Sequence, residues 1–128
     1  NHGRVWNTWK NHFAWNCYLR GRSRKSLSPY AAPARLTDFS GLPPCYTFVG
    51  DGEPFYCETI NYIDRLKACG IPATVDVYHS NMHAFDMMNP DNPMSHKAAE
   101  KFNEQFAYAQ AHYFAPQSAL ANEFTKNS

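Results

Sequence analysis

Two short apolar runs mark this chain, and polar residues follow each of them directly. Residues 45–49 form a continuous, β-prone apolar run, and residues 73–78, which are mostly apolar, form a second β-prone run. Between them, residues 55–69 keep one apolar helical face, and Gly70 and Pro72 follow where a helix end is expected. This order predicts a βαβ unit with two parallel strands, a right-handed crossover and a first strand buried on both faces.

The segment before these runs has a helical period. Residues 4–20 carry apolar side chains four positions apart, which predicts a helix or helical turns with one aromatic face. Such a face needs a partner surface to cover it. The four positions that define it are Val5, Trp9, Phe13 and Cys17.

The remaining segments complete the predicted organisation. Residues 21–26 predict a basic surface loop, and residues 27–44, with four prolines, predict a loop with one helical turn. A last helix is expected over residues 95–114, opened by Pro93 and Ser95, with Ala98, Phe102, Phe106 and Ala109 on one face. We therefore divide the chain into a helix with a proline-rich loop (1–44), a βαβα unit (45–114) and a frayed polar tail (115–128).

Length and composition limit the possible classes of protein. The chain has 128 residues, which is the size of one domain or of part of one, and 44% of them are hydrophobic. Its formal net charge of +1 indicates neither nucleic acid nor an anionic membrane as a partner. No segment is apolar enough over its length to span a bilayer, so we expect no stable membrane insertion.

The four cysteines form no Cys-x-x-Cys pair, which gives a zinc or thioredoxin-like site little support. Cys45 lies in the first predicted strand and Cys69 at a helix end, so both are expected to be buried or half-buried free thiols. Free thiols favour a reducing compartment, and the cytoplasm is the expected location; disulfides are the alternative, because the number of cysteines is even.

Candidate catalytic residues follow both predicted strands. Glu53 comes after the first strand and His83 after the second. Because the carboxyl ends of parallel strands meet at one edge of a sheet, the two side chains are expected to lie close together. A carboxylate that orients an imidazole, and an imidazole that takes a proton from a nucleophile, are two members of a catalytic triad.

Other interpretations of these residues stay open. Asp51 competes with Glu53 as the acid, and His79 competes with His83 as the base. Glu53 alone would also suit a helix start, where the helix dipole favours a carboxylate. His79, His83 and Asp86 are potential metal ligands, but their spacing specifies no metal geometry.

The third member of a triad is missing from the sequence. The chain contains no Gly-x-Ser-x-Gly, the motif that presents a nucleophilic serine on a sharp turn. No other serine has that context; those considered are Ser23, Ser26, Ser28, Ser40, Ser80 and Ser95. We therefore expect the chain to be the C-terminal part of a hydrolase and to be inactive alone.

Several blocks of sequence closely resemble one branch of the α/β-hydrolases, the hormone-sensitive-lipase-like esterases and lipases. The resemblance covers roughly residues 5–114, and the blocks occur in the order found in that family. The matching blocks are Trp15 with Tyr18-Leu19, residues 28–35, residues 38–44, residues 49–55, Glu58, Tyr62, Arg65-Leu66, residues 70–72, Val77-Tyr78 and residues 83–86.

The resemblance implies a function and a fold. By position, Glu53 corresponds to the triad acid, where the family more often has Asp, and His83 corresponds to the triad base. Ala84 replaces a glycine that often follows the base. The implied activity is a serine carboxylesterase or lipase reaction on small or medium acyl esters, with no cofactor and no metal. The implied fold class is α/β: the C-terminal portion of an α/β-hydrolase fold, with an incomplete sheet.

The expected partners follow from this interpretation. The missing N-terminal half of the domain would cover the exposed edge of the sheet, and without it we expect the chain to self-associate. One alternative is a non-catalytic binding or scaffold domain with a hydrolase-derived fold. Another is an enzyme that uses His83 with Asp51, Glu53 or Asp86 and no serine nucleophile.

Overall fold

The structure is a computed structural model and describes residues 5–21, 25 and 27–113. Most of the predicted basic loop and the whole of the predicted polar tail lie outside the described residues. The elements in chain order are α1 (Thr8–Leu19), the 3₁₀ turn η2 (Pro33–Arg35), β1 (Cys45–Gly50), α2 (Tyr56–Ala68), β2 (Ala73–Tyr78), α3 (Phe85–Met88) and α4 (Pro93–His112).

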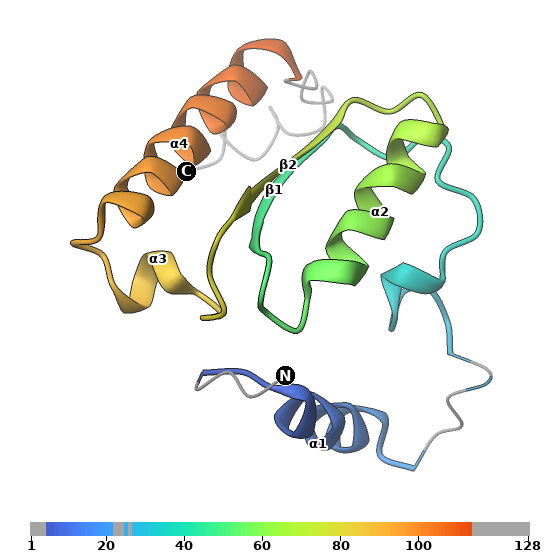
Figure 1. The fold of residues 1–128 in the computed structure, drawn as a ribbon. Helices are drawn as coiled ribbons and strands as arrows, with labels where there is room; N and C mark the ends of the chain where they lie inside the picture. The colour runs from blue at the N-terminus through green and yellow to red at the C-terminus, as the bar shows by residue number, and fades with distance from the viewer. Residues whose placement is uncertain (1–4, 22–24, 26, 114–128) are drawn as a thin grey trace, which may run out of the picture.

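The strands β1 and β2 pair in parallel, as the sequence predicts. Their register runs from Cys45 opposite Ala73 to Gly50 opposite Tyr78. Figure 1 shows α2 on one side of this strand pair and α4 on the other. The carboxyl ends of both strands point toward α1 in the same view. The predicted α/β class and βαβ unit are confirmed, with a sheet of two strands in the described part of the chain.

The end of α2 has the geometry that the sequence predicts. Gly70 has φ of 74°, and its N–H donates to the carbonyl of Lys67. The N–H of Ile71 donates to the carbonyl of Leu66, which completes a Schellman motif. The motif turns the chain toward β2 and places Ile71 in the core beside Leu66.

The main core lies between α2 and the proline-rich loop. Phe39 from the loop is 1% exposed and packs with Ile63, Leu66 and Ile71. Arg65 fastens this loop from the outside: its guanidinium donates hydrogen bonds to the carbonyls of residues 34 and 36. The guanidinium carbon also lies 4.2 Å from the centroid of the Phe39 ring, a cation–π contact.

Several details of burial differ from the prediction. In β1 only Val49 and Gly50 are buried, and the other four residues are half-buried, because β1 has a neighbouring strand on one side alone among the described residues. Cys45 is half-buried, as expected, but Cys69 is exposed. Cys69 was predicted to be covered because it ends an amphipathic helix, yet it lies at the cap, beyond the face that packs on the core.

Apolar side chains remain exposed on two helices. On α1, the stacked rings of Trp9 and Phe13 are 73% and 59% exposed, so nothing in the described residues covers the predicted aromatic face. On α4, Ala98 is buried and Ala109 is half-buried, but Phe102 and Phe106 are about half exposed, so the predicted apolar face is fully covered only at its start. The expected self-association stays a prediction, which light scattering would test.

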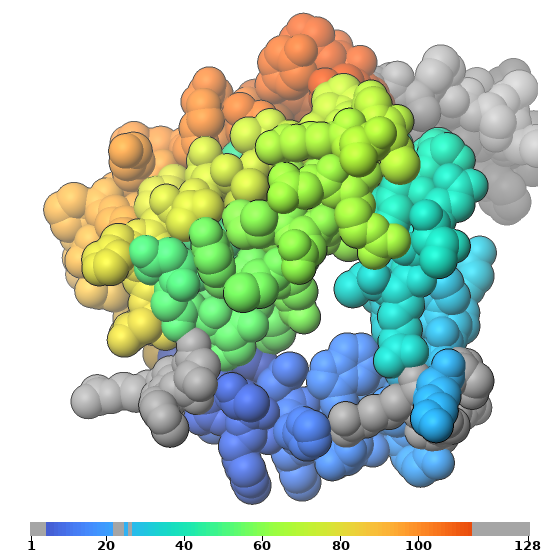
Figure 2. All heavy atoms as spheres, turned by 45° about the vertical axis from the view of Figure 1, so that its right-hand side comes forward, coloured from blue at the N-terminus to red at the C-terminus, as the bar shows by residue number. Residues whose placement is uncertain are grey.

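A hollow lies between one part of α1 and the η2 region, β1 and α2 (Figure 2). It has a volume of about 390 Å³ and is lined by α1, the η2 region, β1 and α2, including Trp15, Thr47 and Tyr62.

No helix among the described residues has the length and apolar character needed to cross a membrane.

Replacing Arg65 by methionine should weaken the attachment of the proline-rich loop to α2. Because the Arg65→Met variant loses two hydrogen bonds and the contact with Phe39, its free energy of unfolding should fall by about 2 kcal/mol. Urea denaturation measures this change. Lys67→Met, an exposed change on the same helix, should stay within about 0.5 kcal/mol of the parent, and equal effects of the two substitutions would contradict this role of Arg65.

Candidate active site

The loops that follow β1 and β2 are joined through their backbones. The N–H of Asp51 donates to the carbonyl of Tyr78 over 2.9 Å, and the N–H of Gly52 donates to the carbonyl of Ser80 over 3.0 Å. A Cβ atom on Gly50 would lie 2.4 Å from the same Ser80 carbonyl oxygen, so no larger residue fits there without a backbone shift. The two loops therefore hold side chains from both strand ends at short range.

Glu53 is held in a buried position by its own turn. Its side chain is 6% exposed, and Oε1 accepts a hydrogen bond from the N–H of Gly50 over 2.7 Å. The backbone N–H of Glu53 donates in return to the carbonyl of Gly50. The helix α2 begins only at Tyr56 and carries Glu58 in its first turn, so Glu53 is not a first-turn acid.

His83 lies against the second oxygen of Glu53. Its Nδ1 is 2.6 Å from Glu53 Oε2, which uses both oxygens of the buried carboxylate. The imidazole also packs edge-on to the ring of Phe55, with centroids 4.9 Å apart, and the ring of Trp6 stacks on that of Phe55. The structure thus brings together the two residues that the sequence indicated as acid and base.

The contact with Glu53 determines what the imidazole can do. A proton on Nδ1 is the one that can donate to a carboxylate, which leaves a lone pair on Nε2 in the neutral ring. Within the described residues, Nε2 makes no hydrogen bond, and the side chain is 41% exposed. An imidazole in this state can accept a proton from a hydroxyl group that approaches its free side.

The rival acid and the rival base contact each other instead. Asp51 Oδ2 lies 2.8 Å from Nδ1 of His79, and Asp51 Oδ1 accepts the N–H of Ser80 over 3.2 Å. The hydrogen bond between them lowers the pKa of Asp51 and raises the pKa of His79. The His79 side chain is 99% exposed, so this second pair lies in solvent, whereas Glu53 is buried.

A sequence model of the α/β-hydrolase fold matches residues 1–87, which include both loops. This chain belongs to the α/β-hydrolase family. The match supports the hormone-sensitive-lipase-like branch of that family. The expected fold class is therefore confirmed.

The solved structures of two esterases are similar to this chain. Esterase LipW from Mycobacterium marinum is 29% identical, with a TM-score of 0.59, over 66% of this chain and 26% of that chain. An inhibited esterase B from Lactobacillus rhamnosis is 16% identical, with a TM-score of 0.58, over 82% of this chain and 37% of that chain, and shares the fold. This chain thus spans between about a quarter and two fifths of the length of these esterases. No curated protein matches it.

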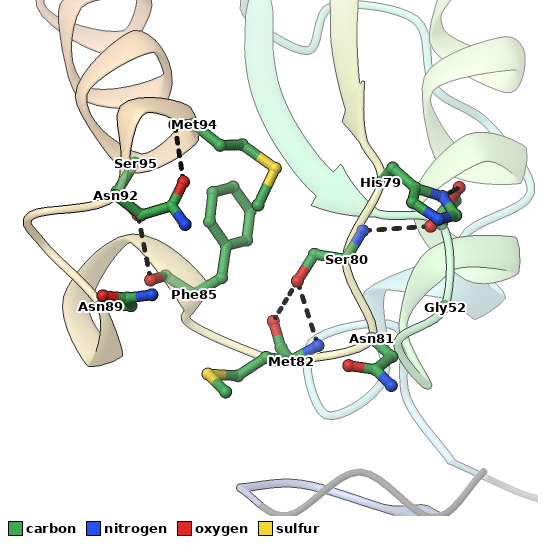
Figure 3. Close-up of a pocket in the computed structure, with 11 residues that line it drawn as sticks. Gly52, His79, Ser80, Asn81, Met82, Phe85, Asn89, Asn92, Met94 and Ser95 are labelled. Carbon is green, nitrogen blue, oxygen red and sulfur yellow. Dashed lines mark hydrogen bonds and ion pairs between the residues drawn. The ribbon is translucent and has the colours of Figure 1, made fainter.

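A cleft with both polar and apolar lining residues lies beside the second pair (Figure 3). It has a volume of about 400 Å³ and is bounded by the loop after β2 on one side and by the start of α4 on the other. Asp51, His79, Asn89 and Asn92 contribute to its lining, whereas Glu53 and His83 do not. No sequence pattern indicates Asn89 and Asn92, because they follow the short helix α3, whose four residues are too few to predict it.

The potential metal ligands His79, His83 and Asp86 are not gathered into one group in the described residues. Among them, no three His, Cys, Asp or Glu side chains are grouped as metal ligands would be. His79 and His83 each contact a different carboxylate, and Asp86 contacts neither imidazole through a hydrogen bond.

His79 should show the pH dependence that its partner imposes. Its pKa should lie above the ordinary value of 6.5, and the Asp51→Asn substitution should bring it back toward that value. NMR titration of the imidazole C–H signals measures both. Asp64→Asn, an exposed change on α2, should leave the titration of His79 unchanged.

The sign of the effect defines a pH window. The raised pKa of His79 favours folding below pH 6.5, and the contribution is lost as pH rises through the raised value. The lowered pKa of Asp51 favours folding above pH 3.8, and the contribution is lost as pH falls through the lowered value. The contact between Asp51 and His79 should therefore stabilise the fold most between pH 3.8 and pH 6.5. A His79 titration that is unaffected by Asp51→Asn would contradict this contact.

Ala84, the residue after His83, has a left-handed backbone conformation with φ of 58°. Glycine reaches this region without the clash that a Cβ atom causes. Ala84→Gly should therefore raise the free energy of unfolding by about 0.5–1 kcal/mol, measured by urea denaturation. Ala68→Gly at the end of α2 should lower it by a similar amount, and a loss of stability in Ala84→Gly would show that the strain is absent.

Proposed function

We propose that this chain supplies the acid and the base of the catalytic triad in a serine ester hydrolase that acts on small or medium acyl esters. Glu53 is the acid and His83 the base. The observation that carries the proposal is the contact of 2.6 Å between Glu53 Oε2 and His83 Nδ1, made by a buried carboxylate and a partly exposed imidazole. Membership of the α/β-hydrolase family and the similarity to solved esterases support the same activity.

The proposed nucleophile is a serine that this chain does not contain. Among the described residues, no serine hydroxyl hydrogen-bonds to His83, and the hydroxyl of Ser80 accepts the N–H of Met82 instead. The free Nε2 of His83 is the atom that such a serine would approach. Without that serine the chain alone hydrolyses no ester, because the remaining groups can activate but cannot attack.

In the proposed reaction, His83 Nε2 takes the proton of the serine hydroxyl while the serine oxygen attacks the ester carbonyl. The tetrahedral intermediate collapses to an acyl-enzyme, and His83 gives its proton to the leaving alkoxide. A water molecule, activated by His83 in the same way, then releases the carboxylic acid and returns the serine to its starting state. Throughout, the Glu53 carboxylate accepts a hydrogen bond from Nδ1–H of His83 and stabilises the imidazolium without taking that proton.

Glu53 fits the role of the acid better than Asp51. A triad acid must be shielded from water, so that its charge acts on the imidazole. Glu53 is buried with both oxygens hydrogen-bonded, whereas the partner of Asp51 is a fully exposed imidazole. The longer glutamate side chain reaches His83 while its own turn holds Oε1.

The test uses the hydrolase that contains this chain together with its serine. Glu53→Gln should lower kcat for hydrolysis of p-nitrophenyl butyrate by about 10⁴-fold and His83→Gln should lower it by about 10⁶-fold, with folding unchanged. Glu53→Gln keeps the size of the side chain but removes the charge that stabilises the imidazolium.

A matched control is His96→Gln, which replaces an exposed imidazole in the first turn of α4 and should leave kcat unchanged. Full activity in a folded His83→Gln variant would refute the proposal. Activity that survives in Glu53→Gln but disappears in Asp51→Asn would reassign the acid to Asp51.

A further inference from the structure

We propose that Asp51 is a positioning residue for His83: it holds the loop after β2 so that Nδ1 of His83 stays on Glu53. This inference rests on the proposed function of the Glu53–His83 pair. It gives Asp51 and His79 a role of their own beside that pair, outside the chemistry.

The first step is the use of both oxygens of Asp51. Oδ2 contacts the ring of His79 over 2.8 Å, and Oδ1 accepts the backbone N–H of Ser80 over 3.2 Å. Both partners belong to the chain that leads from β2 to His83. One carboxylate at the end of β1 therefore holds two consecutive residues of the loop after β2.

The second step carries this restraint along the loop. Ser80 Oγ accepts the N–H of Met82 over 3.1 Å, as Figure 3 shows, and Met82 precedes His83 directly. The Ser80 carbonyl also accepts the N–H of Gly52. A continuous set of hydrogen bonds thus leads from Asp51 through Ser80 to the residue next to His83.

The third step is the weak support that His83 has otherwise. Its ring has one hydrogen bond, to Glu53, among the described residues, and 41% of its side chain is exposed. The residue that follows it, Ala84, has the strained positive φ described above. A loop released on its β2 side would let the strain at Ala84 relax and would draw the imidazole away from the carboxylate.

The location of the Asp51–His79 pair supports a role in holding the loop and not in proton transfer. His79 is 99% exposed, and Nδ1 of its ring is already held by Asp51. The Glu53 carboxylate has no hydrogen bond to either residue of the pair, since its oxygens are used by Gly50 and His83. Asp51 therefore acts on His83 through the loop.

The experiment follows the Nδ1 proton of His83 in this chain by NMR, with ¹⁵N-labelled histidine. The signal is assigned by its loss in His83→Gln and in Glu53→Gln. In Asp51→Ala the exchange of this proton with water should become faster by on the order of tenfold, because the loop loses two hydrogen bonds. Asp51→Asn keeps one acceptor oxygen, so an intermediate rate is expected.

Asp38→Ala is the matched control. Asp38 Oδ1 accepts the N–H of Ser40 over 2.8 Å in the loop before β1, which is the same kind of carboxylate contact without a link to His83. This variant should keep the parent exchange rate. A merely destabilising effect would change both variants alike, and far-UV circular dichroism identifies any variant that has lost its fold.

The outcomes separate this inference from the proposed function. Parent-like exchange in folded Asp51→Ala would overturn the inference and leave the Glu53–His83 pair standing; if Asp51→Ala does not fold, Asp51→Asn decides by the same criterion. If the parent chain shows no signal for the His83 Nδ1 proton, or if that signal persists in Glu53→Gln, the proposed function is overturned, and this inference with it. Faster exchange in the Asp51 variants alone supports it.

Discussion

The buried carboxylate of Glu53 is the constraint on which the rest of this site depends. A charge removed from water must have hydrogen bonds on both oxygens, or its desolvation is not offset. Its own turn supplies one donor, from Gly50, and the other strand supplies the second, from His83. Because these donors come from different strands, the parallel register of β1 and β2 and the close approach at Gly50 become requirements of the site.

The structure contains the same chemical pair twice, in two environments. Each pair joins an acid after β1 to a histidine after β2, through Nδ1 in both cases. The pair nearer the interior has a shielded acid and an imidazole with a free nitrogen, which suits proton transfer. The outer pair, Asp51 and His79, is solvated, so its attraction is weak, and Asp51 adds a second hydrogen bond to the backbone N–H of Ser80 in the loop after β2.

Much of this arrangement could be predicted from the sequence. The two apolar runs and the helix between them determine a parallel unit, and Gly70 marks the end of α2 because few other residues adopt its positive φ. The edge where Glu53 and His83 meet follows from the same argument. The sequence left open which acid pairs with which histidine, because Asp51 and Glu53 are close in sequence, as are His79 and His83. The length of each side chain and the turn at Gly50 determine which acid contacts which histidine. The spacing of these residues along the sequence contains information on neither.

The remaining differences have the same physical origin: burial depends on neighbours that a local pattern does not specify. Cys69 and the rings of Phe102 and Phe106 belong to helices with apolar periodicity, yet they lie past the segments that pack. The short helix α3 was missed because four residues are too few to show a period. Its presence places Asn89 and Asn92 beside the cleft.

The close approach at Gly50 also limits how the length of this chain can vary. A Cβ atom at position 50 would lie 2.4 Å from the carbonyl oxygen of Ser80, so an insertion or deletion that moves another residue into this position would force apart the loops that carry Glu53 and His83. The opposite end of the unit, where α2 passes into β2, lies away from these loops and is free of this constraint. Changes in chain length that keep Glu53 against His83 are therefore expected there.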